Sequence, residues 1–334
     1  MTLTIVGRCD EPSKFAEWEA APELSHVRGH PTTSAAGTKY YADTHPDAVD
    51  ASFAVVHAGA PQLMVKCNAL GGTLGYFSGP ITLLARGHLA REIRDKAIRI
   101  ALSHLDLLAA KHNAPTVAIR EEKVDDGPTL LELECMARGG TKELWQTGLC
   151  DLALSETEIH GRIRKSFKSL VNWGRRNLTL KYFRAENPDP ALFDSYRDFH
   201  AQIAGRITRS DASWNSMRNW ILSGTGELGL AYLEVGELVA GTMIVDGEET
   251  SVYASGVYDR TRFEMPLSHF AIYNAILRSR NRGLKWFDLG HLPEKGSVTD
   301  KEYNIGFFKR GFATDIGMYD VWKYNVTGLD GARV

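Results

Sequence analysis

The sequence predicts an α/β chain of two domains, each a mixed, mostly antiparallel sheet flanked by helices. The first observation is length, because 334 residues exceed the usual ~100–150 residues of one domain. The second is a run of three apolar segments, Leu228 to Val235, Leu238 to Val245 and Thr250 to Val257, joined by short turns that are typical of antiparallel strands. The third is that segments with helical periodicity precede and follow these three strands in the sequence. We therefore predict domains over residues 1–150 and 151–326, followed by a tail over residues 327–334.

Composition and charge restrict the class of protein. Hydrophobic residues make up 43% and charged residues 24% of the chain, and the formal net charge is -2. These values fit a globular protein with an ordinary core and without a general attraction to polyanions. The N-terminus lacks the apolar core of a signal peptide, and no run approaches the ~20 apolar residues of a membrane span. We therefore expect a cytoplasmic chain with no transmembrane segment.

The first domain is predicted from short apolar runs and one long periodic segment. Its strands are predicted over residues 3–6, 52–57, 62–68, 72–78, 116–120 and 129–134, and its helices over residues 12–18 and 88–111. Residues 19–50 lack sustained periodicity and are predicted to form a long loop. The loop contains His26, His30 and His45, but their spacing is not that of metal ligands, so we expect no metal site.

The second domain begins with a clear helix signal. Ser155 and Glu158 have the spacing of a capping box, and the apolar residues that follow predict one amphipathic helix. Further helices are predicted after Asp189, around residues 214–222, and from Pro266 to Arg282. Strands are predicted over residues 284–289, 305–312 and 317–324.

The stretch from Leu284 to Phe312 contains the residues most suggestive of chemistry. The run over residues 284–289 leads to Asp288 and His291, so a carboxylate and an imidazole lie where a strand gives way to a loop. Lys309 lies beside Phe308 in a run suited to burial, and a lysine is seldom fully buried without a partner. These three residues are the first candidates for a site. A lysine at a strand edge that extends to solvent is the ordinary alternative.

The order of predicted elements in the second half resembles the GNAT acyltransferase fold. The segments SETEIHGRIRKSFKSLVNWGRRN, FDLG and IGFFKRGF are similar to the FemABX group of tandem-GNAT transferases and to the related BioF2-like acetyltransferase domains of envelope-sugar pathways. The resemblance covers about residues 154–324. It implies two GNAT-like domains, of which the first is degenerate.

This resemblance implies a transferase that moves an acyl or aminoacyl group from an activated donor to an amine. The donor would be acyl-CoA or aminoacyl-tRNA, with no tightly bound cofactor. The acceptor would be an anionic molecule, either a nucleotide-linked or a lipid-linked sugar or peptide precursor of the cell envelope. The sequence differs from the GNAT pattern at residues 258–266. This segment lacks the glycines with which GNAT enzymes bind the CoA diphosphate.

Each candidate residue has a predicted role. Lys309 matches the lysine that the family places at the reacting centre, where it would stabilise an oxyanion. Asp288 or His291 would assist removal of the amine proton, although Asp288 is equally suited to pair with Lys309. The predicted substrate-binding residues are Tyr253, Tyr258, Arg260, Phe308, Arg164, Lys165 and Lys168.

The last three of these residues belong to a basic segment. Residues 155–184 contain eight lysines or arginines but only two glutamates, Glu156 and Glu158. An excess of positive charge in a nearly neutral chain predicts contact with an anion, such as a nucleotide-linked acceptor, tRNA or CoA. A solvated helix face explains the same pattern. A non-catalytic protein that binds nucleic acid through this segment is the alternative from a different functional class.

Overall fold

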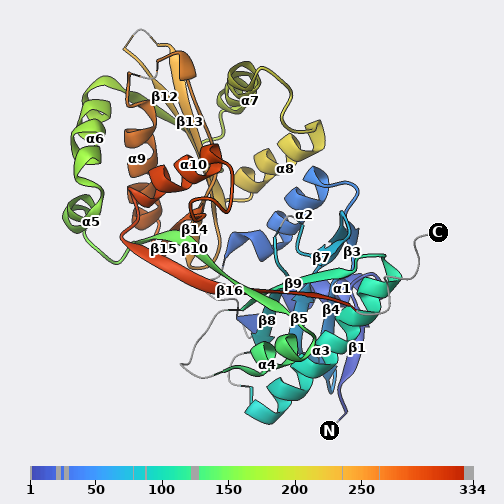
Figure 1. Cartoon of the computed structure of the whole chain (residues 1–334). Helices are drawn as coiled ribbons and strands as arrows, with labels where there is room; N and C mark the ends of the chain where they lie inside the picture. Colours follow the sequence, from blue (N-terminus) through green and yellow to red (C-terminus); the bar gives the residue numbers. More distant parts are fainter. Residues whose placement is uncertain are drawn as a thin grey trace. The chain divides into compact units, whose positions relative to one another are not determined.

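The computed structural model describes residues 2–19, 24–25, 30–77, 79–86, 89–121, 128–234, 236–262 and 264–326 (Figure 1). Their contacts divide the chain into two compact units. Unit 1 comprises Met1–Val27, His45–Trp145 and Met318–Val334, and unit 2 comprises Arg28–Thr44 and Gln146–Gly317. This division differs from the predicted domains because residues 28–44 cluster with unit 2 and residues 318–326 with unit 1. The predicted tail and His26 lie outside the described residues.

Unit 1 contains short strands and one long helix. Its elements are β1 (Thr4–Gly7), α1 (Pro12–Glu19), β2 (Leu24–Ser25), β3 (Val49–Asp50), β4 (Phe53–His57), β5 (Ala60–Lys66), β6 (Asn68–Leu70), β7 (Thr73–Gly75), β8 (Thr82–Arg86), α3 (Arg91–Lys111), β9 (Thr116–Glu121) and α4 (Leu130–Ala137). One sheet has the order β1-β4-β5-β8-β2, and β9 pairs with β7 and with residues 320–325 of β16 (Asp315–Asn325). Leu102, Leu105 and Ala109 of α3 pack with strand residues to form the main core of this unit.

Unit 2 is a sheet with helices on both faces. Its elements are η2 (Pro31–Thr33), α2 (Ala35–Thr44), β10 (Thr141–Asp151), α5 (Glu156–Arg162), α6 (Lys165–Asn177), β11 (Thr179–Phe183), α7 (Pro190–Ala204), α8 (Asp211–Leu222), β12 (Gly226–Tyr232), β13 (Leu238–Asp246), β14 (Thr250–Tyr258), η3 (Arg260–Arg262), α9 (Leu267–Asn281), β15 (Trp286–His291) and α10 (Asp300–Arg310). The strand order is β11-β12-β13-β14-β15-β10. Neighbouring strands are antiparallel except for β14 and β15, which are parallel.

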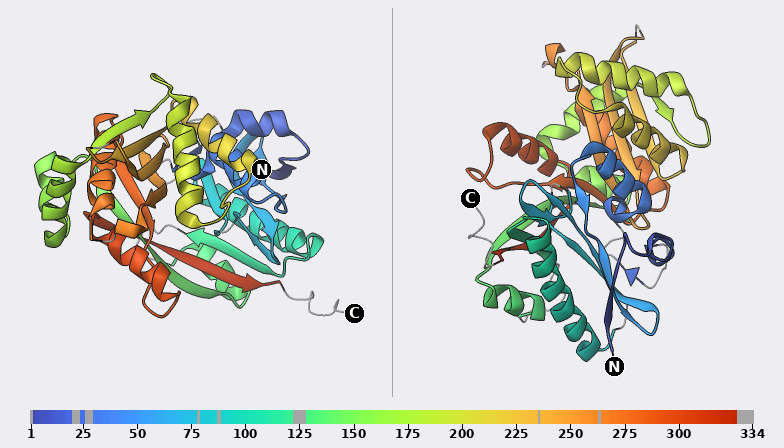
Figure 2. Two further views of the ribbon diagram at one scale, coloured as in Figure 1. Left: turned by 90° about the horizontal axis from the view of Figure 1, so that it is seen from above. Right: turned by 90° about the vertical axis from the view of Figure 1, so that its right-hand side faces the viewer.

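Two apolar clusters fill the space between this sheet and its helices. Helices α5, α6 and α9 contribute to one cluster, which includes Phe167, Ile272 and Phe287. Helices α7 and α8 contribute to the other, which includes Tyr196 and Trp214. Figures 1 and 2 show α6 and α9 on one side of β12 and β13, with α7 and α8 on the other. The predicted fold class, a mixed and mostly antiparallel α/β structure, is confirmed.

Several predicted elements are wrong, and their end signals explain why. Residues 305–312 are not a strand, because α10 begins after Thr299, whose side chain forms a capping box with Glu302. Residues 129–134 are likewise helical, since the Thr129 hydroxyl accepts a hydrogen bond from the Glu132 amide at the start of α4. Such side-chain caps satisfy amide groups that a helix start leaves without partners.

Other differences concern elements that the sequence did not indicate. The predicted loop over residues 19–50 contains α2, and strands β8, β10 and β11 were not predicted. The capping box at Ser155 and Glu158 is confirmed, but the helix after it is two helices, because Ile163 and Arg164 adopt extended backbone angles. Among the described residues, no helix has the length and apolar composition needed to cross a membrane.

Candidate active site

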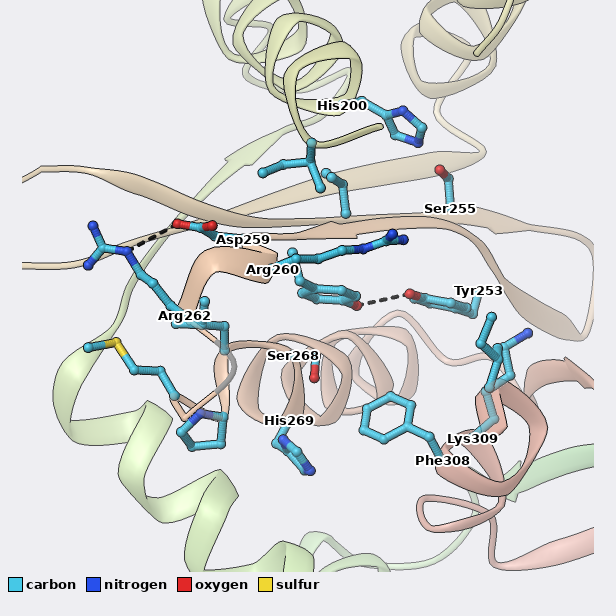
Figure 3. A pocket seen from close by; sticks show the side chains of 18 of the residues that line it. His200, Tyr253, Ser255, Asp259, Arg260, Arg262, Ser268, His269, Phe308 and Lys309 are labelled. Carbon is cyan, nitrogen blue, oxygen red and sulfur yellow. Dashed lines mark hydrogen bonds and ion pairs between the residues drawn. The ribbon is translucent and has the colours of Figure 1, made fainter. Parts of the chain in front are cut away.

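The candidate site lies where strands β14 and β15 separate. Their described pairing covers Thr250 to Val252 of β14 and Trp286 to Asp288 of β15. A β-bulge at Ala254 then shifts the register of β14 against β13, and such bulges often redirect side chains beside functional sites. A cavity of about 760 Å³ follows, lined by Tyr253 to Arg260 and by residues of α7, α9 and α10 (Figure 3).

Lys309 lines this cavity from α10 rather than from a strand. Its half-buried ammonium lies 5.5 Å from the centre of the Tyr253 ring, within the range of a cation–π contact. It also lies against Gly290, where a Cβ atom would be 3.1 Å from Nζ. In the part of the chain that the structure describes, no carboxylate forms an ion pair with this lysine. Its positive charge is therefore open to a ligand.

Asp288 is buried, and two donors bind one of its carboxylate oxygens. It is 8% exposed, and its Oδ1 accepts hydrogen bonds from the Thr147 hydroxyl at 2.5 Å and from the Gly290 amide at 2.6 Å. His30 Nε2 lies 3.6 Å from Oδ2. Burial alone would raise the pKa of Asp288, but His30, Thr147 and Gly290 together hold it below its usual range. Asp288 is thus a buried anion, and it is not among the residues that line the cavity.

The charges near Lys309 act on it in opposite directions. Partial desolvation lowers the pKa of the Lys309 ammonium, and the Asp288 carboxylate opposes this decrease. His291 ends strand β15 and is more exposed than Asp288. Desolvation lowers the pKa of the His291 imidazole, and the charge of Lys309 adds to this decrease. The contact with the Gln146 backbone raises the pKa but does not cancel the decrease. At neutral pH His291 is therefore uncharged and able to accept a proton, although it does not line the cavity.

Four of the predicted substrate-binding residues line the cavity, namely Tyr253, Tyr258, Arg260 and Phe308. The hydroxyls of Tyr253 and Tyr258 are 2.9 Å apart, and burial raises the pKa of both groups, so both are neutral hydrogen-bonding groups. Figure 3 shows Arg260 extending along the same wall as Tyr253, with Phe308 opposite. The exposed Arg260 guanidinium has no ion-pair partner in the described residues.

The other three predicted residues lie outside this cavity. Arg164 donates a hydrogen bond to the Phe307 carbonyl at 2.7 Å, and its guanidinium lies 4.1 Å from the centre of the Phe307 ring. Lys168 donates to the Gly161 carbonyl at 2.8 Å, and Lys165 is exposed on the first turn of α6. Their predicted contact with an anion therefore concerns the surface of α5 and α6, separate from the cavity lining.

Arg209 is a cavity residue that sequence reasoning missed. Its guanidinium lies 3.2 Å from His200 Nε2 and 3.3 Å from the Ser255 hydroxyl, while Nε lies 3.4 Å from the Tyr40 hydroxyl. The serine and tyrosine hydroxyls are uncharged. Burial and then the charge of Arg209 lower the pKa of the His200 imidazole, which favours its neutral form. A cation held only by neutral groups attracts an anionic ligand. No local sequence pattern marks it, because Tyr40 is distant in the sequence.

His269 is the second missed residue, near the start of α9. Its ring contacts Phe167, Phe308 and Phe312 at centroid distances of 4.6, 5.3 and 6.0 Å. Desolvation lowers the pKa of His269 to about 4, so it is neutral at pH 7. Its buried Nδ1 has no hydrogen-bond partner in the described residues. The apolar wall of the cavity thus contains one neutral imidazole.

The segment before α9 lacks the glycines of a backbone phosphate site. Arg262 is paired with Asp259 at 3.1 Å and with Glu237 at 2.6 Å, and Pro266 occupies the N-cap position. An anion at this end of the cavity would therefore meet Arg260 before any helix amide. Among the described residues, no group of three or more His, Cys, Asp or Glu side chains could hold a metal ion.

Comparisons with known proteins place this geometry in a structural context. No protein-family model matches the sequence, and no curated protein matches it. Among solved structures, FemX is similar with a TM-score of 0.62 and 13% identity over 97% of each chain. A tandem GNAT protein from the clavulanic acid biosynthesis pathway has a TM-score of 0.57 and 13% identity over 97% of this chain and 99% of that one.

A third solved structure is L-PGS from Bacillus licheniformis, with a TM-score of 0.58 and 13% identity over 88% of each chain. At this identity the comparisons establish a shared fold. The predicted resemblance to FemX and to tandem GNAT proteins is thus confirmed at the level of structure. The chain has the tandem-GNAT fold.

Proposed function

We propose that this protein is an N-acyltransferase, which moves an acyl or aminoacyl group from an activated donor to an amine. The observation that carries the proposal is the half-buried ammonium of Lys309, which lines a cavity at the separation of β14 and β15. A cation in a partly desolvated site interacts more strongly with developing negative charge than it would in water. The shared fold with FemX and with a tandem GNAT protein supports the same class.

The proposed reaction requires no nucleophile from the protein. The acceptor nitrogen attacks the donor carbonyl carbon, a C–N bond forms, and the carbonyl oxygen becomes an oxyanion beside the Lys309 ammonium. The intermediate then collapses, the bond from carbon to the leaving sulfur or oxygen breaks, and the leaving group takes up a proton. The amine loses one proton, for which the neutral His291 is the proposed acceptor. Asp288 instead favours the charged form of Lys309, while its Oδ1 accepts hydrogen bonds from Thr147 and Gly290.

The proposed acceptor is an anionic, nucleotide-linked or lipid-linked precursor of the cell envelope. Arg209 supports this proposal because its half-buried guanidinium lines the cavity and has no ion-pair partner among the described residues. In Figure 3, His200 and Ser255, the partners of Arg209, lie on the wall opposite His269 and Phe308. An acceptor phosphate or carboxylate bound by Arg209 would leave the amine free to extend toward Lys309.

The proposed donor is acyl-CoA, with aminoacyl-tRNA as the alternative. Filter retention of the purified protein with radiolabelled acetyl-CoA or with charged tRNA separates these two donors, because retention of only one label identifies it. Mass spectrometry of envelope precursors from cells that lack the protein then identifies the acceptor as the species that accumulates without its acyl group. Absence of any such change, together with retention of neither label, would contradict the proposed function.

A protein that only binds nucleic acid through residues 155–184 makes a different prediction. Lys165 and Arg176 are exposed and form no ion pair with a carboxylate among the described residues, so RNA binding through them would weaken as salt increases. Such binding would be unaffected by Lys309→Met. Detection of acyl transfer that this substitution abolishes would exclude the purely binding function.

A further inference from the structure

His30 contacts the buried carboxylate beside Lys309, although it lies far upstream in the sequence. Its Nε2 is 3.6 Å from Asp288 Oδ2, which is within ion-pair distance but longer than a hydrogen bond. The side chains of His30 and Asp288 are 16% and 12% exposed. Residues 30–44 belong to unit 2, so this contact is formed within one compact unit.

The partners of His30 determine which of its nitrogens carries the proton. Nδ1 accepts a hydrogen bond from the Thr32 amide at 3.4 Å, where His30 caps η2, and it lies 2.7 Å from the Thr32 hydroxyl. An amide can only donate, so Nδ1 holds the lone pair and Nε2 carries the hydrogen. The N–H group at Nε2 is therefore the one that lies near Asp288.

The same carboxylate connects to the backbone that supports Lys309. Oδ1 accepts from the Gly290 amide, and Gly290 is the residue against which the Lys309 ammonium packs. Gly290 has a φ of +89°, and a Cβ atom there would lie only 3.1 Å from Lys309 Nζ. Glycine suits this position because it adopts positive φ without strain and has no Cβ atom. His30, Asp288, Gly290 and Lys309 thus form a continuous series of contacts that ends at the cavity.

We infer that His30 is a positioning residue for the proposed reaction: it fixes the Asp288 carboxylate, shares its negative charge, and thereby sets the field that acts on the Lys309 ammonium. The role in catalysis rests on the proposed function, whereas the coupling between the side chains does not. Residues 30–44 also supply Tyr40, which contacts Arg209. One upstream segment therefore contacts Asp288, which acts on Lys309, and also contacts Arg209 itself.

The coupling is testable without knowing either substrate. Competitive labelling of amines with acetic anhydride, read by mass spectrometry at a series of pH values, gives the titration of Lys309 itself. Among the described residues, the charged or titratable groups near Lys309 are Asp288, His291 and Tyr253, whose ring centre lies 5.5 Å from Nζ. Asp288→Asn should shift the titration down by about one pH unit, because an anion that favours the ammonium is lost. His30→Ala should shift it up, because Asp288 then acts on Lys309 without the opposing N–H dipole.

The double variant decides whether His30 acts through Asp288. His30→Ala added to Asp288→Asn should cause no further shift, and His30→Gln, which keeps an N–H donor, should titrate close to the native protein. His57→Gln is the matched control, since His57 contacts only the Thr2 carbonyl, at 3.0 Å, among described hydrogen bonds. If His30→Ala fails to fold, His30→Asn replaces it, because its shorter amide does not reach Asp288.

Three results would overturn the inference. They are an absent or downward shift in His30→Ala, an unchanged titration in Asp288→Asn, and an added shift in the double variant. The pH profile of kcat should follow the Lys309 titration in each variant once transfer is measured. If the titrations behave as expected but Lys309→Met retains transfer, the proposed function fails while the coupling stands.

Discussion

Two lysines, one in each unit, differ in whether a carboxylate forms an ion pair with the ammonium or lies near it without pairing. Lys66 on β5 is 1% exposed, and its Nζ lies 2.9 Å from Glu19 Oε1. Lys309 on α10 lines a cavity and has its nearby acid, Asp288, occupied by other donors. Burial lowers the pKa of both lysines, and in both cases a carboxylate opposes it.

The two lysines differ in whether their positive charge remains accessible to a ligand. Lys66 forms an ion pair with Glu19 and is almost entirely buried, so its charge is not accessible to a ligand from solvent. Asp288 instead acts on Lys309 without forming an ion pair with it, while Oδ1 of the carboxylate accepts hydrogen bonds from Thr147 and Gly290. The carboxylate thus favours the ammonium form without covering it. An acid that is held away from a lysine can thus favour an ammonium that stays open to a ligand, as the proposed role of Lys309 requires.

Lys66→Met should give the largest loss of stability. Removing one member of a buried ion pair costs about 3–5 kcal/mol when the other charge loses its main partner, and the Arg8 guanidinium, 3.9 Å from Glu19 Oε2, replaces only part of this contact. Urea denaturation measures the change in free energy of unfolding. The double variant Lys66→Met with Glu19→Gln should recover much of the loss, because no uncompensated buried carboxylate remains. A loss below about 1 kcal/mol, the scale of exposed pairs, would show that this pair resembles a surface contact.

Gly256→Ala should have an intermediate effect on the cavity wall. A Cβ atom at this position would lie 1.9 Å from the Tyr253 hydroxyl and 2.9 Å from that of Tyr258. The hydroxyl pair must therefore separate, and overpacking of this kind costs about 1–3 kcal/mol. Thermal unfolding measures the loss. Unchanged stability would mean that the tyrosine moves at no cost, and Gly247→Ala, in the turn before β14, serves as the control outside the cavity.

A smaller effect is expected in the pH dependence of stability. The pKa of His269 falls from 6.5 to about 4 on folding, so between these values the unfolded chain binds a proton that the folded protein does not. Stability should therefore decrease as pH falls through this window. His269→Phe should remove that contribution and flatten the profile of unfolding free energy against pH. A profile that remains parallel to that of the native protein would contradict the assigned shift.

The sequence was sufficient for the fold class and for part of the site. The β12–β14 strands follow from alternating apolar runs with short turns, and Asp288 and His291 lie at the predicted strand end. The strand predicted over residues 305–312 is wrong because a capping box upstream starts the helix α10. Its apolar run resembles a strand, yet Thr299 and Glu302 have the same capping-box spacing that identified the helix at Ser155. This cap fixes the start of a helix, and the apolar run over residues 305–312 then continues that helix as far as Arg310.

The remaining site residues depend on contacts that no local pattern encodes. His30 reaches Asp288, and Tyr40 reaches Arg209, only after the chain has folded. The orphaned nitrogen of His269 likewise depends on three phenylalanines from α6, α10 and the residues after it. Periodicity predicts which face of an element is apolar, whereas it does not predict which distant side chain meets that face.

The most direct test of the account compares acyl transfer by Lys309→Met with transfer by Lys301→Met. Both lysines belong to α10, but Lys301 is exposed in the first turn and does not line the cavity. Loss of an oxyanion-stabilising group should lower kcat about 10²–10³-fold in Lys309→Met, with the melting temperature unchanged and Lys301→Met near the native rate. Equal rates in the two folded variants would contradict the claim that the Lys309 ammonium stabilises the reacting centre.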